Sequence, residues 1–217
     1  MIDINKEIAQ LNWNKEPRGL YEPIEYTLAS GGKRLRPHLA IIAAEAVING
    51  GLINSMDDVL PAALALEVFH NFTLVHDDVM DRAEVRRGQE TVHRKWNNNT
   101  AILSGDQMLI EAYKLLAQVP APKLPQVLKW FNEMATGVCE GQQYDMEFEH
   151  MSQVSIEDYL KMIELKTSVL LANAMRIGGY IAGADHSQQE ALYQYGLNIG
   201  IAFQIQDDIL DVYGDPK

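Results

Sequence analysis

Apolar residues recur every three to four positions along most of this chain, which is the spacing of one face of a helix. Alternating β-branched runs bounded by turn residues, the mark of half-buried strands, are scarce. The pattern therefore predicts an all-α fold. We expect helices over residues 4–12, 18–30, 35–49, 57–81, 90–95, 99–118, 123–148, 155–183 and 187–213.

Glycine and proline clusters separate the expected helices. They lie at Gly31-Gly32, Gly50-Gly51, Pro120-Ala121-Pro122 and Gly183-Ala184-Asp185. Several of the segments are long enough to cross a helical bundle from end to end, and facing helices of a bundle can build a site in its core. With 217 residues, 47% of them hydrophobic, the chain is expected to fold as a single domain over residues 1–217.

The charge and the cysteine content narrow the function classes. A net charge of -12 argues against a nucleic-acid partner and is compatible with divalent cations. The single cysteine, Cys139, rules out an internal disulfide framework and fits a reducing cytoplasm, and we expect it to pack as a small residue. The start lacks the basic-then-apolar order of a signal peptide. No uninterrupted apolar run reaches membrane-spanning length, so no transmembrane segment is expected.

Two groups of aspartates carry the strongest functional signal. Each ends a long apolar helical run, and the members are Asp77, Asp78 and Asp81 in one and Asp207, Asp208 and Asp211 in the other. In a helix the first and last acids of a group lie about one turn apart, with the middle one on the flank. Like charges at this spacing repel each other, so a compensating cation is expected.

A solvated helix end is the alternative reading of such a group. The apolar runs that precede the acids, at 62–66 and 199–203, make two solvated charged faces unexpected. An EF-hand calcium loop is excluded because its alternating oxygen ligands around an obligatory glycine are absent. Carboxylates that leave positions for water and substrate phosphates are typical of Mg²⁺ sites.

The residues around the acids predict a pocket with a polar mouth and an apolar floor. His70 and Thr73 share a helical stripe with the first acid group, as Gly200 and Gln204 do with the second. Gly196 and Gly200 each cost about 1 kcal/mol within a helix. We interpret them as sites of close helix packing, with space for a ligand as the alternative.

Basic residues accompany the acids. Residues 31–37, Gly-Gly-Lys-Arg-Leu-Arg-Pro, concentrate three cations at a loop-to-helix junction, and Arg86-Arg87-Gly88 follows the first acid group. Guanidinium groups bind phosphate oxygens bidentately, although surface charge explains most basic pairs. Lys166-Thr167 lies within an apolar helix, where a lysine that extends to solvent is an equal alternative.

Taken in order from about residue 30, these motifs resemble the trans-isoprenyl diphosphate synthases. They are 31–37, 70–81, 86–88, Lys166-Thr167 and 203–211, Phe-Gln-Ile-Gln-Asp-Asp-Ile-Leu-Asp. The resemblance implies an antiparallel helical bundle of the isoprenoid synthase type with a central active-site cavity. It also implies head-to-tail condensation of isopentenyl diphosphate with an allylic diphosphate (dimethylallyl, geranyl or farnesyl) to a C15–C20 product, by a homodimer.

The resemblance also assigns roles by position. The ligands of Mg²⁺, three ions with substrate bound, would be Asp77, Asp78, Asp81, Asp207, Asp208 and Asp211. Isopentenyl diphosphate would bind Lys33, Arg36, His70 and Arg87. The allylic substrate would contact Arg86, Lys166, Thr167 and Gln204, with Gln142 and Asp145 as supporting groups. Among these the catalytic residues would be Asp77, Asp78, Asp81, Lys166, Asp207 and Asp208.

Product length would depend on the residues before the first acid group. Phe72 lies five residues before Asp77, about 7.5 Å along the axis, and Thr73 lies one turn before it. Thr73 lies on the same side of the helix as Asp77, whereas Phe72 has the larger side chain. In the resembling family an aromatic at the first position and a small residue at the second imply a short-to-medium-chain enzyme. Phe72 lies about 140° around the helix from Asp77, so packing against a neighbouring helix is the alternative.

Two other functions stay open. A terpene cyclase also ionises allylic diphosphates, but it needs no isopentenyl-binding Lys33, Arg36 and His70. A non-catalytic regulatory subunit of a heteromeric synthase commonly lacks one acid group, and this chain has both. Members of the resembling family continue beyond the second acid group, so we expect the chain to lack their C-terminal helices.

Overall fold

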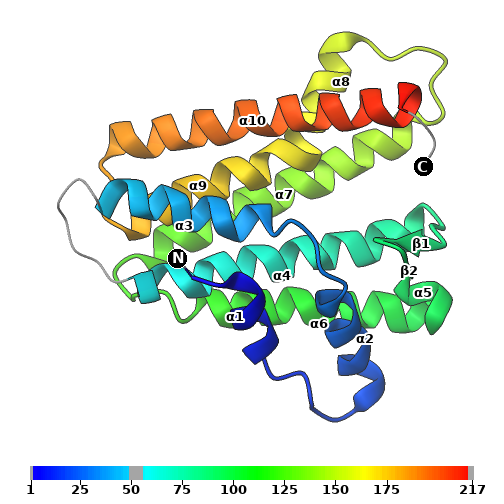
Figure 1. The fold of residues 1–217 in the computed structure, drawn as a ribbon. Helices are drawn as coiled ribbons and strands as arrows, with labels where there is room; N and C mark the ends of the chain where they lie inside the picture. The colour runs from blue at the N-terminus through cyan, green and yellow to red at the C-terminus, as the bar shows by residue number, and fades with distance from the viewer. Residues whose placement is uncertain (1, 49–55, 215–217) are drawn as a thin grey trace. The chain divides into compact units, whose positions relative to one another are not determined.

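The computed structural model describes residues 2–48 and 56–214, and within them the all-α prediction is confirmed (Figure 1). The helices are α1 (Ile4–Gln10), α2 (Arg18–Ala29), α3 (Leu35–Ile48), α4 (Met56–Met80), α5 (Val92–Lys95), α6 (Asn98–Leu116), α7 (Leu124–Phe148), α8 (Ile156–Ile163), η1 (Glu164–Ser168), α9 (Val169–Ile181) and α10 (His186–Tyr213). The break predicted at Gly50-Gly51 lies outside the described residues.

Two short strands, which the sequence analysis did not predict, follow the first acid group. Strand β1 (Val85–Arg86) pairs with β2 (Gln89–Glu90) in an antiparallel hairpin. Both loop residues between the strands have positive φ, 53° at Arg87 and 75° at Gly88. Positive φ at both central residues is what a type I′ hairpin turn requires. The Arg-Gly dipeptide, read only as charge, was therefore also a turn signal.

The chain forms two compact units. The first unit comprises Met1–His38 and Leu60–Val119, and the second comprises Leu39–Val59 and Pro120–Lys217. Each unit carries one of the two acid groups, so the two groups are described separately. The single domain over residues 1–217 stays a prediction.

The first unit is built on α4 and its packing against α2 and α6. Its buried side chains include Ile24 and Leu28 of α2, Phe69 of α4 and Met108 of α6, none more than 2% exposed. Burial of each such side chain stabilises the fold by about 1.5–3 kcal/mol. The imidazole of His76 reaches across to α6, where its Nε2 lies 3.0 Å from the carbonyl oxygen of Ile102.

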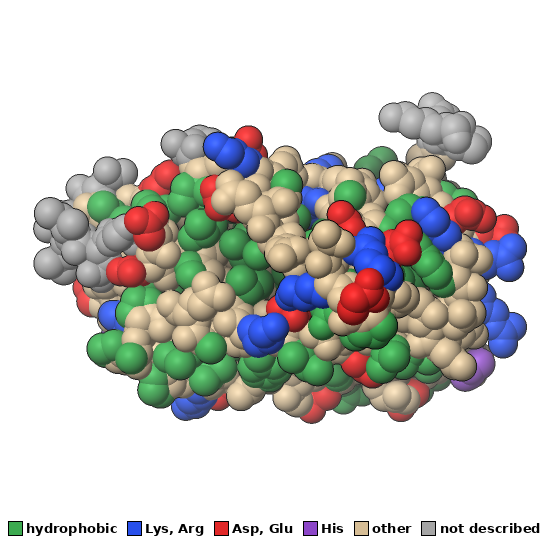
Figure 2. Space-filling view, turned by 90° about the horizontal axis from the view of Figure 1, so that it is seen from below, with side chains coloured by type: hydrophobic (Ala, Val, Ile, Leu, Met, Phe, Trp, Pro, Cys, Tyr) green, Lys and Arg blue, Asp and Glu red, His purple; other side chains and the backbone are tan. Residues whose placement is uncertain are grey.

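Helix α6 also exposes a stripe of large apolar side chains. They are Ile102, Leu103, Ile110 and Tyr113, exposed by 44%, 59%, 52% and 38%. The spacing keeps them on one side of the helix. Figure 2 shows that hydrophobic side chains, drawn in green, form continuous areas on the face seen from below.

In the second unit, α7, α9 and α10 bury their apolar faces together. Helix α10 begins with a capping box, in which Asp185 accepts from the Gln188 backbone N–H at 2.9 Å and Gln188 accepts in return. A Cβ atom on Gly196 would lie 2.7 Å from Ala172 Cα, and one on Gly200 would lie 2.6 Å from Ser168 Cα. The interpretation of these glycines as sites of close helix packing is confirmed.

Helix α4 bears on the expectation that no segment crosses a membrane. By length and composition alone this helix could cross a bilayer, and 61% of its apolar window is buried inside the protein. Its Glu67 is only 1% exposed and pairs with Arg34. A buried, paired charge and a mostly covered surface are also found in core helices of soluble proteins, so the membrane evidence is weak.

Cys139 is exposed on α7, and the prediction that it packs as a small residue was wrong. The residue type suggested burial, whereas the buried stripe of α7, which includes Phe131, Met134 and Val138, leaves position 139 to one side.

Candidate active site

The first acid group ends α4, and its members differ in environment. Asp78 is only 4% exposed, and one of its oxygens accepts a 2.7 Å hydrogen bond from Arg86 Nε. Loss of hydration raises the pKa of Asp78 above its usual value, while the Arg86 guanidinium partly opposes this rise. Asp77 is half-buried in the last turn of α4, and Asp81 is exposed just beyond the helix.

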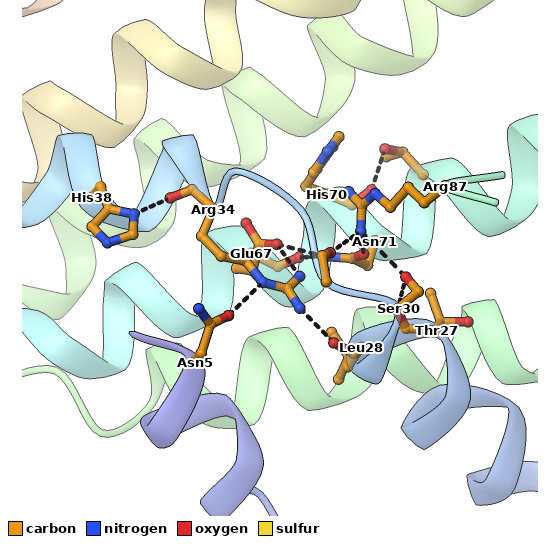
Figure 3. Close-up of polar contacts among 12 residues, drawn as sticks. Asn5, Thr27, Leu28, Ser30, Arg34, His38, Glu67, His70, Asn71 and Arg87 are labelled. Carbon is orange, nitrogen blue, oxygen red and sulfur yellow. Dashed lines mark hydrogen bonds and ion pairs between the residues drawn. The ribbon is translucent and has the colours of Figure 1, made fainter. Parts of the chain in front are cut away.

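The hairpin turn places Arg87 beside the glycine loop that precedes α3 (Figure 3). Its Nη1 donates to the carbonyl oxygen of Gly31 at 2.6 Å and to Asn71 Oδ1 at 3.3 Å. A Cβ atom on Gly32, whose φ is 126°, would lie 2.9 Å from the Arg87 guanidinium carbon. The second glycine of the motif therefore allows the loop to fold around this guanidinium.

Arg34, the middle cation of residues 31–37, points into the protein rather than toward solvent. It is 4% exposed, and its Nη1 donates to Glu67 Oε1 at 2.7 Å. Asn71, one turn after Glu67, donates to the same oxygen at 3.0 Å. A buried charge needs such partners. The sequence analysis missed Glu67 and Asn71, although their four-residue spacing on the acid helix was a visible signal.

His70 and Arg36 lie among further positive charges in the first unit. Loss of hydration and the charges of Arg36 and Arg87 hold the pKa of His70 well below its ordinary 6.5. Burial lowers the pKa of Arg36 to about 10, while Glu67 opposes this change. Within the described residues no acceptor reaches the buried Nε of Arg36. An anion bound here would supply the negative charge that the surroundings of His70 and Arg36 lack. Lys33 is exposed in the same loop.

Phe72 and Thr73 occupy different faces of α4. The Phe72 ring lies 4.8 Å from the His76 ring and 5.5 Å from the Phe69 ring, measured between centroids. Thr73 Oγ1 donates to the backbone oxygen of His70 at 2.8 Å. His76 is the residue that contacts α6, so Phe72 shares a face with the packing side of the helix. The chain-length role stays a prediction for both residues.

In the second unit, a π-helical turn presents Lys166 and Thr167. In η1 the Val169 N–H bonds to the carbonyl of Glu164, five residues back, where one uninterrupted α-helix had been predicted. Such turns often occur at functional sites. Lys166 Nζ donates to Asp145 Oδ2 at 2.5 Å. A Cβ atom on Gly141, one turn before Asp145, would lie 2.3 Å from the Lys166 backbone nitrogen, so this glycine permits the approach.

Next to this pair, a chain of hydrogen bonds joins η1, α10 and α8. Thr167 Oγ1 donates to Gln204 Oε1 at 2.9 Å, and Gln204 Nε2 donates to Asp208 Oδ1 at 2.8 Å. Tyr159 donates to the other carboxylate oxygen of Asp208 at 2.5 Å. Loss of hydration and this bond raise the pKa of Tyr159 to about 12. Tyr159 was not predicted, although it precedes Lys166 by seven residues, two turns of the expected helix.

These side chains line a cavity of about 620 Å³ in the second unit. Its polar wall contains Asp145, Tyr159, Lys166, Thr167, Gln204 and Asp208. Its apolar wall contains Phe148, Val154, Ile156, Met162 and Ile163. Five residues predicted from motifs far apart in sequence thus meet in one cavity, and Gln142 is buried one turn before Asp145. The arrangement combines hydrogen-bond donors for an anion with apolar surface for a hydrocarbon.

The remaining acids of the second group lie outside the cavity lining. Asp207 is half-buried and Asp211 is exposed, and among the described residues no hydrogen bond or ion pair reaches either side chain. Within either unit, the part of the chain that the structure describes has no group of three His, Cys, Asp or Glu residues close enough to hold a metal. Carboxylates still suit Mg²⁺, which commonly binds one or two of them and completes its shell with water and substrate phosphates.

The sequence was compared with known proteins. Residues 17–217 match the polyprenyl synthetase family. The geranylgeranyl diphosphate synthase of Methanosarcina mazei is 47% identical over 90% of this chain and 60% of its own length. A crystal structure of a geranylgeranyl pyrophosphate synthase superposes with a TM-score of 0.92 at 50% identity, covering 99% of this chain and 64% of its own.

A second solved structure was determined with ligands. It is a polyprenyl synthase from Caulobacter crescentus complexed with calcium and isoprenyl diphosphate, with a TM-score of 0.86 at 33% identity, covering 96% of this chain and 61% of its own. The chain thus spans about 60–64% of the length of these relatives.

Proposed function

The chain belongs to the polyprenyl synthetase family, and from this premise we propose that the protein condenses isopentenyl diphosphate with an allylic diphosphate to a trans-prenyl diphosphate. The observation that carries the proposal is the cavity of the second unit, which is lined both by Lys166, Thr167, Gln204 and Asp208 and by apolar side chains.

We assign the allylic diphosphate to this cavity. Lys166 would neutralise the charge that gathers on the diphosphate as the allylic carbon–oxygen bond breaks, and Thr167 would orient it. The departing diphosphate takes the bonding electron pair and leaves a carbocation. The apolar wall formed by Phe148, Met162 and Ile163 would keep water from this cation.

We assign isopentenyl diphosphate to the cations of the first unit. Arg36 has an unused buried N–H, and His70 in its neutral form can donate one more. Together with Lys33 and Arg87 they would hold the diphosphate while the double bond attacks the cation. A proton is then lost from the new chain, and the departed diphosphate is its acceptor. Arg86 is assigned to the allylic substrate by the resemblance.

Mg²⁺ is the proposed cofactor, with three ions when substrate is bound. Its ligands would be the six aspartates of the two groups, of which Asp78 accepts from Arg86 and Asp208 from Gln204. The ion would supply positive charge that stabilises the leaving diphosphate.

The test is product formation from isopentenyl diphosphate, an allylic primer and Mg²⁺. We expect Asp77→Ala and Asp207→Ala each to lower turnover by orders of magnitude, with about 1.4 kcal/mol of transition-state stabilisation lost per tenfold. EDTA should also stop the reaction. The exposed acids Glu22 and Glu149 offer matched controls, Glu22→Gln and Glu149→Gln, which should retain activity. Full activity in EDTA, or in either aspartate variant, would contradict the proposal.

The same assay separates the other functions. A terpene cyclase would release a hydrocarbon or alcohol without consuming isopentenyl diphosphate. A regulatory subunit would make no product alone. Both acid groups and the isopentenyl-binding cations favour the transferase.

We also propose a cytoplasmic homodimer. The single cysteine fits a reducing compartment. The exposed apolar stripe of α6, Ile102, Leu103, Ile110 and Tyr113, supports a helical interface between two copies.

A further inference from the structure

Among the described residues, Asp208 is the one carboxylate of its group that accepts a hydrogen bond at each of its two oxygens. Gln204 donates to Oδ1 at 2.8 Å from one turn earlier on α10, and Tyr159 donates to Oδ2 at 2.5 Å from α8. Among the described residues, no other hydrogen bond reaches Oδ2. The Tyr159 hydroxyl therefore decides which way the carboxylate plane is turned.

The orientation of Asp208 passes to the cavity wall through Gln204. The amide oxygen of Gln204 accepts from Thr167, so its nitrogen must face Asp208. An amide has two distinct ends, and reversing it would place its oxygen against the Asp208 carboxylate, two acceptors that cannot bond. The hydrogen bonds that join Tyr159, Asp208, Gln204 and Thr167 can thus all form in only one arrangement of the amide.

We propose that Tyr159 is a positioning residue for the allylic substrate. Through Asp208 it holds Gln204 and Thr167 in the arrangement that binds the allylic diphosphate in the cavity. The inference rests on the proposed prenyl transfer and adds a residue of the cavity wall that acts on the substrate through Asp208. A hydroxyl that only ties α8 to α10 is the competing explanation. That tie would affect unfolding but would not act on one substrate selectively.

The decisive variant is Tyr159→Phe, which removes the hydroxyl and keeps the ring. We expect the KM for the allylic diphosphate to rise about tenfold, the typical effect of losing a charge-assisted hydrogen bond. The KM for isopentenyl diphosphate should not change, because its assigned residues lie in the other unit. Tyr195→Phe is the matched control, since Tyr195 is 60% exposed on α10. This control should behave as the wild type in both substrates.

A double-mutant cycle with Thr167→Val tests the connection itself. If Tyr159 acts through the chain, its removal should have little further effect on the allylic KM once Thr167 can no longer donate to Gln204. The protein is used at full length, and thermal unfolding is measured for each variant.

The outcomes are distinct. Equal changes in both KM values, an unchanged allylic KM, or effects that multiply in the double variant would overturn the positioning role while leaving prenyl transfer intact. Loss of folding in Tyr159→Phe with normal allylic binding by the remaining folded protein would assign the hydroxyl to structure alone. A wild type that forms no product would overturn the proposed function and this inference together.

Discussion

At the scale of single residues, two arginines of the first unit have backbone conformations that cost free energy. Arg34 and Arg87 both have positive φ, 45° and 53°, a conformation that costs a residue with a Cβ atom about 1–2 kcal/mol. Their guanidinium groups make hydrogen bonds that offset this cost, to Glu67 and Leu28 for Arg34 and to Gly31 and Asn71 for Arg87. Loss of hydration, and then the neighbouring positive charges, hold the pKa of His70 well below 6.5 and so favour its neutral form.

The neutrality of His70 predicts a stability change with pH. Its pKa in the folded protein lies below the ordinary 6.5, so the unfolded chain binds the proton more tightly. The stabilisation is present above pH 6.5 and is lost as the pH falls toward the folded value, by up to about 1.4 kcal/mol per pH unit. We expect the free energy of unfolding, measured with denaturant between pH 7.5 and 5.5, to change less steeply with pH in His70→Gln than in the wild type. A slope equal to that of wild type would contradict the prediction, and His150→Gln, at an exposed position, is the control.

A second prediction at this scale concerns Phe72. If its ring limits the growing chain, Phe72→Ala should shift the products to longer prenyl chains, measured by chromatography of the extracted prenols. Thr73→Ser, which keeps the hydroxyl bonded to His70, should preserve the wild-type distribution. An unchanged distribution in Phe72→Ala, with a lower melting temperature, would assign Phe72 to packing against His76 and Phe69. Products of C30 or longer from the wild type would overturn the predicted length.

At the scale of elements, the contact between α7 and η1 determines where Lys166 lies. Two glycines of α7 differ sharply in the space around them. A Cβ atom on Gly141 would meet the Lys166 backbone at 2.3 Å, whereas one on Gly137 would lie 3.5 Å from the Leu165 side chain. Only the first position depends on the absence of a side chain.

Gly141→Ala should therefore push η1 away from α7 and separate Lys166 from Asp145. We expect a loss of stability of about 1–3 kcal/mol, typical of overpacking, and a higher KM for the allylic diphosphate. Gly137→Ala should be tolerated or slightly stabilising, because alanine favours the helix and meets ordinary contacts. Thermal unfolding and steady-state kinetics of both variants check this. Equal behaviour of the two alanine variants would show that the close approach at Gly141 is not required.

At the scale of the whole molecule, the sequence predicted the helices but not every side-chain contact between them. The helical spacing of apolar residues predicted α2, α4, α7 and α10 to within a few residues. Motifs identified Lys166, Thr167 and Gln204, which the fold brings to one cavity. The bonds of Lys166 to Asp145 and of Tyr159 to Asp208 depend on how helices cross, which spacing along one helix does not encode. The π turn was missed because a shift of register over a single turn is hard to distinguish within a long apolar helix.

The contact between Gly32 and Arg87 has a consequence for how the protein can evolve. Arg87 fills the space where a side chain at position 32 would begin, so the effect of a substitution at one position depends on the residue at the other. Replacing Arg87 first would remove the steric barrier at Gly32 and leave only the cost of its φ of 126°. Replacing Gly32 first would meet both barriers at once. A substitution at position 32 is therefore expected to cost less where Arg87 has already been replaced, and otherwise the guanidinium must move away from its bonds to Gly31 and Asn71.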